Sequence, residues 1–213
     1  MEELDLLKKA WKKDEHSFNQ VSEKEIYKML HKKSSSIVKW ILIISILEFL
    51  LWSGLSFCMK DGDAMKKFNN MHVDNIMLPL TIFGYVVLVY FFYQFYINYR
   101  KISVTDDAKK LIKSILTVRK TVNRYVWFNI IFGMVSIVVI TLLQLNYDVD
   151  TIALREHYSL KGNSTTFYMF YAVFIVVFLA VFVLLFWLFY RLIYGILLRR
   201  LHKNYEELKK IDL

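Results

Sequence analysis

Four long apolar stretches constrain the fold of this chain more than any other feature. The last of them has no charged side chain between Phe167 and Tyr190. A helix of about 20 apolar residues crosses the roughly 30 Å hydrocarbon core of a bilayer, whereas a surface helix of a soluble protein needs a polar face. We therefore predict an all-α polytopic membrane protein with four transmembrane helices in a bundle. The stretches cover about residues 37–59, 76–97, 125–145 and 166–190.

The composition agrees with helices in lipid. Apolar residues make up 56% of the chain and aromatic residues 17%, with one Pro and six Gly; soluble domains are roughly 45–50% apolar. Cys58 is the one cysteine, so the sequence predicts neither an internal disulfide nor a thiolate metal site. Residues 1–36 are too charged for the apolar core of a signal peptide, and we expect the first apolar stretch to be a retained span.

Basic residues are concentrated on one side of the predicted membrane. Residues 1–39, 99–125 and 191–213 together hold 23 of the 28 Lys and Arg, and the loops 60–75 and 147–165 hold the rest. Cytoplasmic loops carry the excess of Lys and Arg, so we predict the inner (plasma) membrane with both termini in the cytoplasm. The net charge of +9 would also suit a nucleic-acid partner. Because topology explains the charges, we expect no such partner.

Residues 1–36 are predicted to be a cytoplasmic helical arm with a short first helix and a second helix that runs through His31-Lys32-Lys33 into the first span, each with an apolar stripe. Ser22 and Glu25 have the spacing of a capping box, which predicts the start of the second helix. Apolar residues three and four positions apart lie on one helix face, and we expect these faces to bind a protein partner. The stripes consist of Leu4, Leu7 and Trp11 in the first helix and of Ile26, Met29 and Leu30 in the second.

Residues 37–213 are predicted to be the membrane bundle, with a cytoplasmic helical loop at 100–124 and a C-terminal helix at 191–213. Thr105 or Asp106 can cap the loop helix. Spacings of four and three residues are typical of helices that pack side by side. Either the spans continue as helices that pack on one another, or each stripe lies flat on the inner leaflet. The repeating residues are Leu111, Ile115, Val118 and Val122 in the loop and Tyr194, Leu198, Leu201, Tyr205 and Leu208 in the tail.

Glu48 is the most informative single residue. It lies nine positions after Lys39, which is about 13 Å along a helix and close to the middle of the bilayer. An ionisable group at that depth is costly, so its side chain is expected to face the bundle interior. Two interpretations stay open: a proton- or cation-binding carboxyl, or a carboxyl that hydrogen-bonds two helices together. Neutral partners are expected from Tyr85, Tyr90, Ser136, Thr141 or Gln144.

Six basic residues stand at or near the cytoplasmic ends of the spans. Each Lys or Arg near an anionic leaflet contributes about 1 kcal/mol of attraction, and we predict that these side chains contact the lipid bilayer. They are Lys32, Lys33, Lys39, Arg100, Arg124 and Arg191.

The remaining polar residues suggest no catalytic or metal centre. A membrane haem held by two His would need them inside the bundle, whereas all five lie outside the spans: His16, His31, His72, His157 and His202. Asp61, Asp63, His72 and Asp74 share one outer loop, but their spacing matches no recognised ligand pattern. Neither hydrolase nor nucleotide-binding motifs occur. We therefore predict no enzyme, no catalytic residues, no metal and no cofactor.

The stretch EIYKMLHKKSSSIVKW at residues 25–40, with Leu6-Leu7-Lys8-Lys9 and Trp11, resembles the opening of a family of uncharacterised bacterial four-span membrane proteins. Members of that family sometimes bear a carotene-monooxygenase label. Carotenoid oxygenases are β-propellers with four iron-binding His, whereas this chain is predicted to be helical and its His are scattered. The label therefore does not fit, and the resemblance implies a membrane location without an activity.

Two functional hypotheses follow from the sequence. The first is a non-enzymatic regulatory or scaffolding protein that binds a partner through its cytoplasmic helices. The second is a small transporter or channel subunit, a homo-oligomer that uses Glu48 as its proton or cation site.

Overall fold

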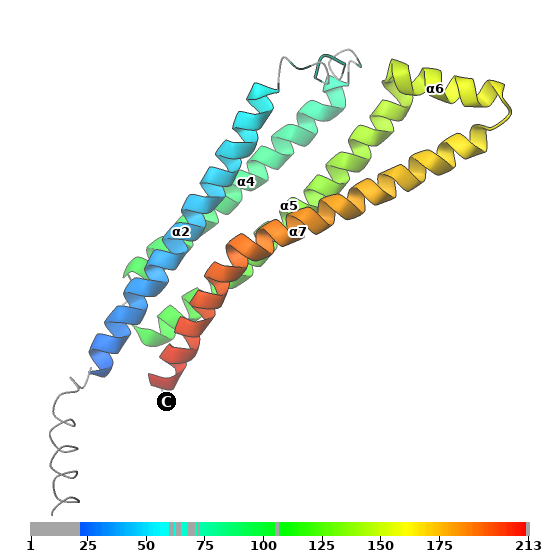
Figure 1. Cartoon of the computed structure of the whole chain (residues 1–213). Helices are drawn as coiled ribbons and strands as arrows, with labels where there is room; N and C mark the ends of the chain where they lie inside the picture. Colours follow the sequence, from blue (N-terminus) through cyan, green and yellow to red (C-terminus); the bar gives the residue numbers. More distant parts are fainter. Residues whose placement is uncertain are drawn as a thin grey trace, which may run out of the picture.

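Four long helices run side by side, and one short helix lies across one end of them (Figure 1). The computed structural model describes residues 22–59, 62, 65–67, 71, 73–104 and 107–211. The predicted all-α fold is confirmed, because every element that the structure describes is a helix. Four of these helices, α2, α4, α5 and α7, are each long and apolar enough to cross a membrane. The helices are α2 (Glu23–Cys58), α4 (Asp74–Val104), α5 (Ala108–Tyr147), α6 (Val149–Leu160) and α7 (Ser164–Ile211).

The long helices form a ring of neighbours. α2 packs on α4 and α7, and α5 packs on the same two helices, so α2 and α5 lie diagonally opposite. In Figure 1 the four helices converge toward the end where the chain terminates, and α5 and α7 separate toward the other end. There α6 connects them, and we call this the far end.

The helix starts agree with local capping rules. The capping box predicted at Ser22 and Glu25 is present, with Ser22 Oγ accepting from the Glu25 backbone N–H and the Glu25 carboxylate accepting from the Ser22 N–H. The cap of α5 is Asp107, which directly follows the two predicted candidates Thr105 and Asp106. An Asp side chain at this position accepts a backbone N–H that the helix itself leaves unpaired.

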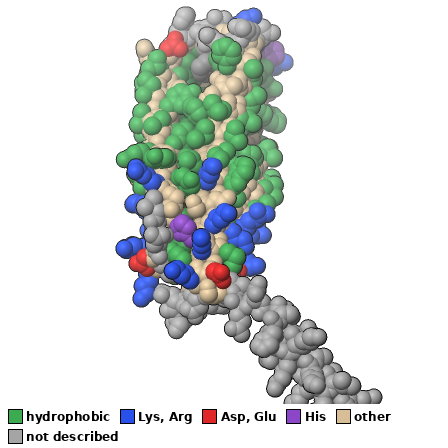
Figure 2. Space-filling view, turned by 90° about the vertical axis from the view of Figure 1, so that its left-hand side faces the viewer, with side chains coloured by type: hydrophobic (Ala, Val, Ile, Leu, Met, Phe, Trp, Pro, Cys, Tyr) green, Lys and Arg blue, Asp and Glu red, His purple; other side chains and the backbone are tan. Residues whose placement is uncertain are grey.

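The helices extend well beyond the apolar stretches. α7 has 48 residues, which is about 72 Å and roughly twice the thickness of a bilayer core. We call residues 22–36, 100–104, 107–124 and 191–211 the basic end, and the rest of the four long helices the apolar half. On the face in Figure 2, most Lys and Arg gather on the lower part, and hydrophobic side chains predominate in the middle of the molecule above them.

The basic end has a closely packed core. The predicted loop stripe of Leu111, Ile115, Val118 and Val122 is fully buried, and Tyr194, Leu201 and Leu208 of the tail are at most 1% exposed. Ser34 and Asn204 meet inside this core, where the Asn204 amide donates to Ser34 Oγ over 3.2 Å. The stripes therefore pack on one another as continued helices, and they do not lie flat on a leaflet.

The apolar half exposes most of its large side chains. No residue in the most apolar stretch of α7 is buried, and Phe174 and Val176 are about two-thirds exposed. Toward the far end, Met71, Val73 and Leu143 form a small separate cluster. Such a surface suits contact with lipid, which is as apolar as the side chains themselves.

The predicted outer loop at 147–165 contains a helix that was not predicted from the sequence. α6 fills most of it, and Asp148 caps α6 by accepting from the Thr151 backbone N–H. A carboxylate three residues before that N–H was the available signal. None of the α6 residues is buried. Asp150 of α6 forms an ion pair with Lys67, which lies between α2 and α4.

Candidate functional site

A cluster of one carboxyl group and three tyrosines joins three helices of the bundle. Glu48 of α2 accepts a hydrogen bond from the hydroxyl group of Tyr190 at 2.5 Å through Oε1. Its Oε2 accepts from Tyr125 at 3.0 Å and from Tyr194 at 3.3 Å. We call these four residues the Glu48 cluster.

The tyrosine rings of the cluster pack against one another. Their centroids lie 5.9 to 6.3 Å apart, in the edge-on and tilted arrangements that aromatic pairs favour. Phe91 and Phe95 of α4 complete the packing, each with its ring 5.4 Å from Tyr125. All four long helices therefore contribute to one aromatic core around the carboxyl group.

The partners predicted for Glu48 were wrong. Tyr90 accepts from Gln94 on its own helix, and the Thr141 hydroxyl donates to the Ile137 carbonyl. Tyr125 and Tyr190 come from the predicted cytoplasmic ends of the third and fourth spans, and Tyr194 comes from the predicted C-terminal helix. Glu48 therefore lies nearer the basic end than its position along α2 suggested. Counting residues gives a depth within one helix, but the axial offset between helices is a tertiary property.

A small cavity adjoins the Glu48 cluster. It has a volume of about 140 Å³, enough for several water molecules. Polar groups of Ser53, Ser56 and Asn129 line it together with Glu48, and Tyr85, one of the predicted partners, lines it as well. The carboxylate therefore accepts hydrogen bonds from three hydroxyl groups and also lines a cavity that can hold water.

The chemistry of the cluster is that of a hydrogen-bonded anion or its protonated form. A carboxylate has about four acceptor positions, and three are used by tyrosine hydroxyls. Within the described ranges, no Lys, Arg or His forms a hydrogen bond or ion pair with Glu48. The arrangement ties α2, α5 and α7 together, and it can also hold a proton or a small cation.

The predicted partner-binding stripes are only partly described. Leu4, Leu7 and Trp11 lie outside the described residues. In α2, Leu30 is buried in the bundle and Ile26 packs against its core. Met29, which is 54% exposed, is therefore the one residue of the second stripe that presents most of its side chain to the surroundings.

The six predicted interface residues are all exposed. Lys32, Lys33 and Lys39 follow one another along α2, whereas Arg100, Arg124 and Arg191 stand on α4, α5 and α7. The Arg191 guanidinium lies 4.7 Å from the centre of the Trp187 ring, which is a cation–π contact. Their contact with lipid stays a prediction.

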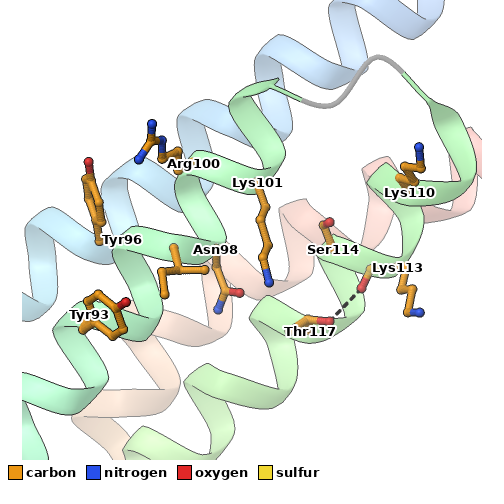
Figure 3. Close-up of a pocket in the computed structure, with 10 residues that line it drawn as sticks. Tyr93, Tyr96, Asn98, Arg100, Lys101, Lys110, Lys113, Ser114 and Thr117 are labelled. Carbon is orange, nitrogen blue, oxygen red and sulfur yellow. Dashed lines mark hydrogen bonds between the residues drawn. The ribbon is translucent and has the colours of Figure 1, made fainter.

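A larger cavity, which was not predicted from the sequence, lies between α4 and α5 at the basic end. Its volume is about 740 Å³. Figure 3 shows the side chains that line it, with Asn98 and Lys101 extending from α4 toward α5. Its lining comes from two helices, so neither stretch of sequence alone reveals it.

These features define a class of protein: a multi-pass membrane protein of four long helices joined by a half-buried carboxyl group and three buried tyrosines. Residues 24–213 match the family described as "Domain of unknown function (DUF8845)", and the chain belongs to this family. No curated protein and no solved structure matches the chain.

Proposed function

We propose that this protein is a non-enzymatic scaffold or regulator whose basic end binds a soluble or membrane protein partner. The observation that carries this proposal is the closely packed core of the basic end. A helical surface fixed by a core loses little conformational entropy on binding, so it suits recognition.

The partner surface is centred on Met29 of α2. Leu30 and Ser34 are buried in the core and fix this part of the helix. Met29 is exposed between the exposed side chains of Lys28 and Lys32. An apolar centre with a charged rim is the usual anatomy of a protein interface, and the positive rim favours an acidic partner.

The basic end faces the cytoplasm of the inner membrane in this proposal. The distribution of Lys and Arg supports that orientation. Cys58, exposed at the far end of α2, provides a direct test. A membrane-impermeant maleimide added to intact spheroplasts is expected to label it, and the Cys58→Ser variant is the control. Labelling only after the membrane is opened would contradict the orientation.

Quantitative affinity purification in mild detergent tests the partner. The double variant Met29→Asp/Lys32→Glu is compared with the wild type and with Lys109→Glu/Lys120→Glu. The control pair reverses two exposed charges on α5 and leaves α2 unchanged. We expect at least one protein to be recovered with the wild type and the control but to be depleted with the α2 variant.

Deletion of residues 1–21 extends the same experiment to the first stripe of the arm. The scaffold proposal fails if neither the α2 variant nor this deletion changes the set of recovered proteins. Equal depletion by the α2 and α5 variants would show a general charge effect and would count against a specific surface.

A second function is favoured by one observation, the polar cavity beside the Glu48 carboxyl group. In this alternative the chain is a small oligomeric transporter or channel subunit, and Glu48 is its proton or cation site. Glu48→Gln keeps the size of the side chain and its acceptor oxygen but removes the charge. Ion flux into proteoliposomes is expected to vanish in the variant, and flux equal to that of empty vesicles in the wild type would exclude this alternative.

A further inference from the structure

The cavity between α4 and α5 combines four basic side chains with hydroxyl and amide groups. Arg100, Lys101, Lys110 and Lys113 supply the charge, and Asn98, Ser114 and Thr117 are the polar groups between them. Among the described residues, Lys110 pairs with Asp107 at 3.9 Å, whereas Arg100 and Lys113 form no ion pair. Positive charge beside hydrogen-bond donors is the chemistry that recognises a phosphate group.

The position of the cavity along the bundle points to the membrane surface. The Asn98 amide donates to Thr121 Oγ1 over 3.3 Å, which aligns the two helices at this level. The apolar stretch of α4 ends next to Asn98, and that of α5 begins one turn after Thr121. The basic side chains therefore begin where the hydrocarbon core ends, which is the depth of lipid headgroups.

An apolar track leads along α4 to the same cavity. Val86, Val89, Tyr93, Tyr96 and Arg100 are spaced 3-4-3-4 and lie on one helix face. The two valines are about 60% exposed, and the two tyrosines line the cavity with their rings exposed. Figure 3 shows Tyr93, Tyr96 and Arg100 following one another along α4. A ligand at the cavity thus meets apolar surface on one side and positive charge on the other.

We propose that this cavity binds the phosphate headgroup of an anionic phospholipid, with an acyl chain lying along the Val86–Tyr96 face of α4. A free phosphate ion would use the basic groups alone, whereas a lipid uses the basic groups and the apolar track together. The track therefore favours the lipid as the occupant. This site is separate from the Met29 surface of the proposed partner, so either proposal can fail without the other.

Native mass spectrometry of the full chain in a neutral, delipidated detergent tests the proposal. The protein is titrated with phosphatidylglycerol and, separately, with phosphatidylcholine of the same acyl chains. We expect phosphatidylglycerol to bind roughly tenfold more tightly, because its net negative charge is attracted by the basic side chains. Equal affinity for the two lipids would overturn the proposal.

Two matched double variants locate the site. Arg100→Gln/Lys113→Gln removes two cavity charges that form no ion pair with any described residue, and Arg199→Gln/Arg200→Gln removes two exposed charges on α7. The cavity variant is expected to bind phosphatidylglycerol roughly thirtyfold more weakly, because each basic side chain near a lipid surface contributes about fivefold. The α7 variant should stay within about twofold of the wild type. Equal weakening in both would overturn the site.

A competition experiment with inorganic phosphate distinguishes a phospholipid headgroup from a free phosphate ion as the ligand of the cavity. At millimolar concentration it should neither bind the cavity nor displace phosphatidylglycerol. Displacement that depends on Arg100 and Lys113 would overturn the lipid assignment in favour of a soluble ligand.

Because both variants change exposed residues, each is first checked for the wild-type elution volume. If the cavity variant elutes abnormally, Lys113→Gln alone replaces it, with an expected weakening of about fivefold.

Discussion

The basic end and the apolar half are built from the same four helices, yet they are held together differently. In the basic end, Ile115, Val118 and Leu201 are fully buried, and charged side chains cover the outside. In the apolar half, many large side chains are exposed, and the contacts between helices include aromatic ring pairs and the hydrogen bonds of Glu48. The hydrophobic effect stabilises the first region, because only there does burial remove apolar surface from water.

This difference indicates which interactions stabilise each region. In lipid, helices associate through close packing and hydrogen bonds, since burial against a neighbour gains little over burial in lipid. We therefore expect the basic end to respond to loss of apolar volume and the apolar half to respond to loss of hydrogen bonds or to steric change. Four comparisons test this expectation, each measured as the unfolding free energy in mixed detergent micelles.

The largest effect is expected from the core of the basic end. Leu201→Ala removes a fully buried side chain of α7 and should lower the unfolding free energy by about 2–5 kcal/mol. Leu184→Ala, on the same helix but 57% exposed in the apolar half, should change it by less than about 1 kcal/mol. Equal losses from the two variants would contradict the contrast between the regions.

A smaller effect is expected from the Glu48 cluster. Tyr190→Phe keeps the ring but removes the hydroxyl that donates to the carboxyl group, and the loss should be about 2 kcal/mol because the acceptor is ionisable. Tyr168→Phe is the matched control, since within the described chain its hydroxyl makes no hydrogen bond and the residue is 48% exposed. An unchanged stability for Tyr190→Phe would show that the cluster does not hold the helices together.

Two glycines in the apolar half are expected to respond with opposite signs. A methyl group at Gly133 would overlap the Phe182 ring, which is itself held against Phe186 with centroids 4.3 Å apart. Gly133→Ala should therefore lose about 1–3 kcal/mol. Nothing lies within 4 Å of the corresponding position at Gly54, so Gly54→Ala should gain up to about 1 kcal/mol from helix propensity. A gain in both variants would mean that α5 and α7 are not in close contact.

The smallest effect is expected from the charged exterior of the basic end. Lys203 and Glu207 form an ion pair at 4.0 Å on α7, with side chains that are 80% and 42% exposed. Lys203→Gln should change the unfolding free energy by less than about 0.5 kcal/mol, because water and salt screen such pairs. A loss comparable to that of Leu201→Ala would show that the exterior charges, and not the core, stabilise this region.

Several features of the fold could be predicted because they depend on one helix at a time. The stripe from Leu111 to Val122 was predicted as a packing face from its spacing, and all four of its residues are buried. The capping box at Ser22 likewise needs only the sequence around it. The α6 helix was missed because a short polar helix with no buried residue lacks an apolar period.

The candidate sites could not be predicted to the same extent, since they depend on several helices. Glu48 was recognised from its place in an apolar stretch, but its three tyrosine partners were not, because the sequence does not record how far each helix is shifted along its neighbours. Met29 and Leu30 have equivalent positions in the pattern, and only the packing of α2 decides that one is exposed and the other buried.

The sequence by itself determined that this protein has four membrane-spanning helices with apolar stripes beyond them, because length, hydropathy and period are properties of a single segment. The tertiary structure alone decided that these stripes form one buried core, that Glu48 meets Tyr125, Tyr190 and Tyr194, and that α4 and α5 leave a basic cavity between them. Those features arise from the rotation and axial offset of each helix, which are set by the packing of all four together.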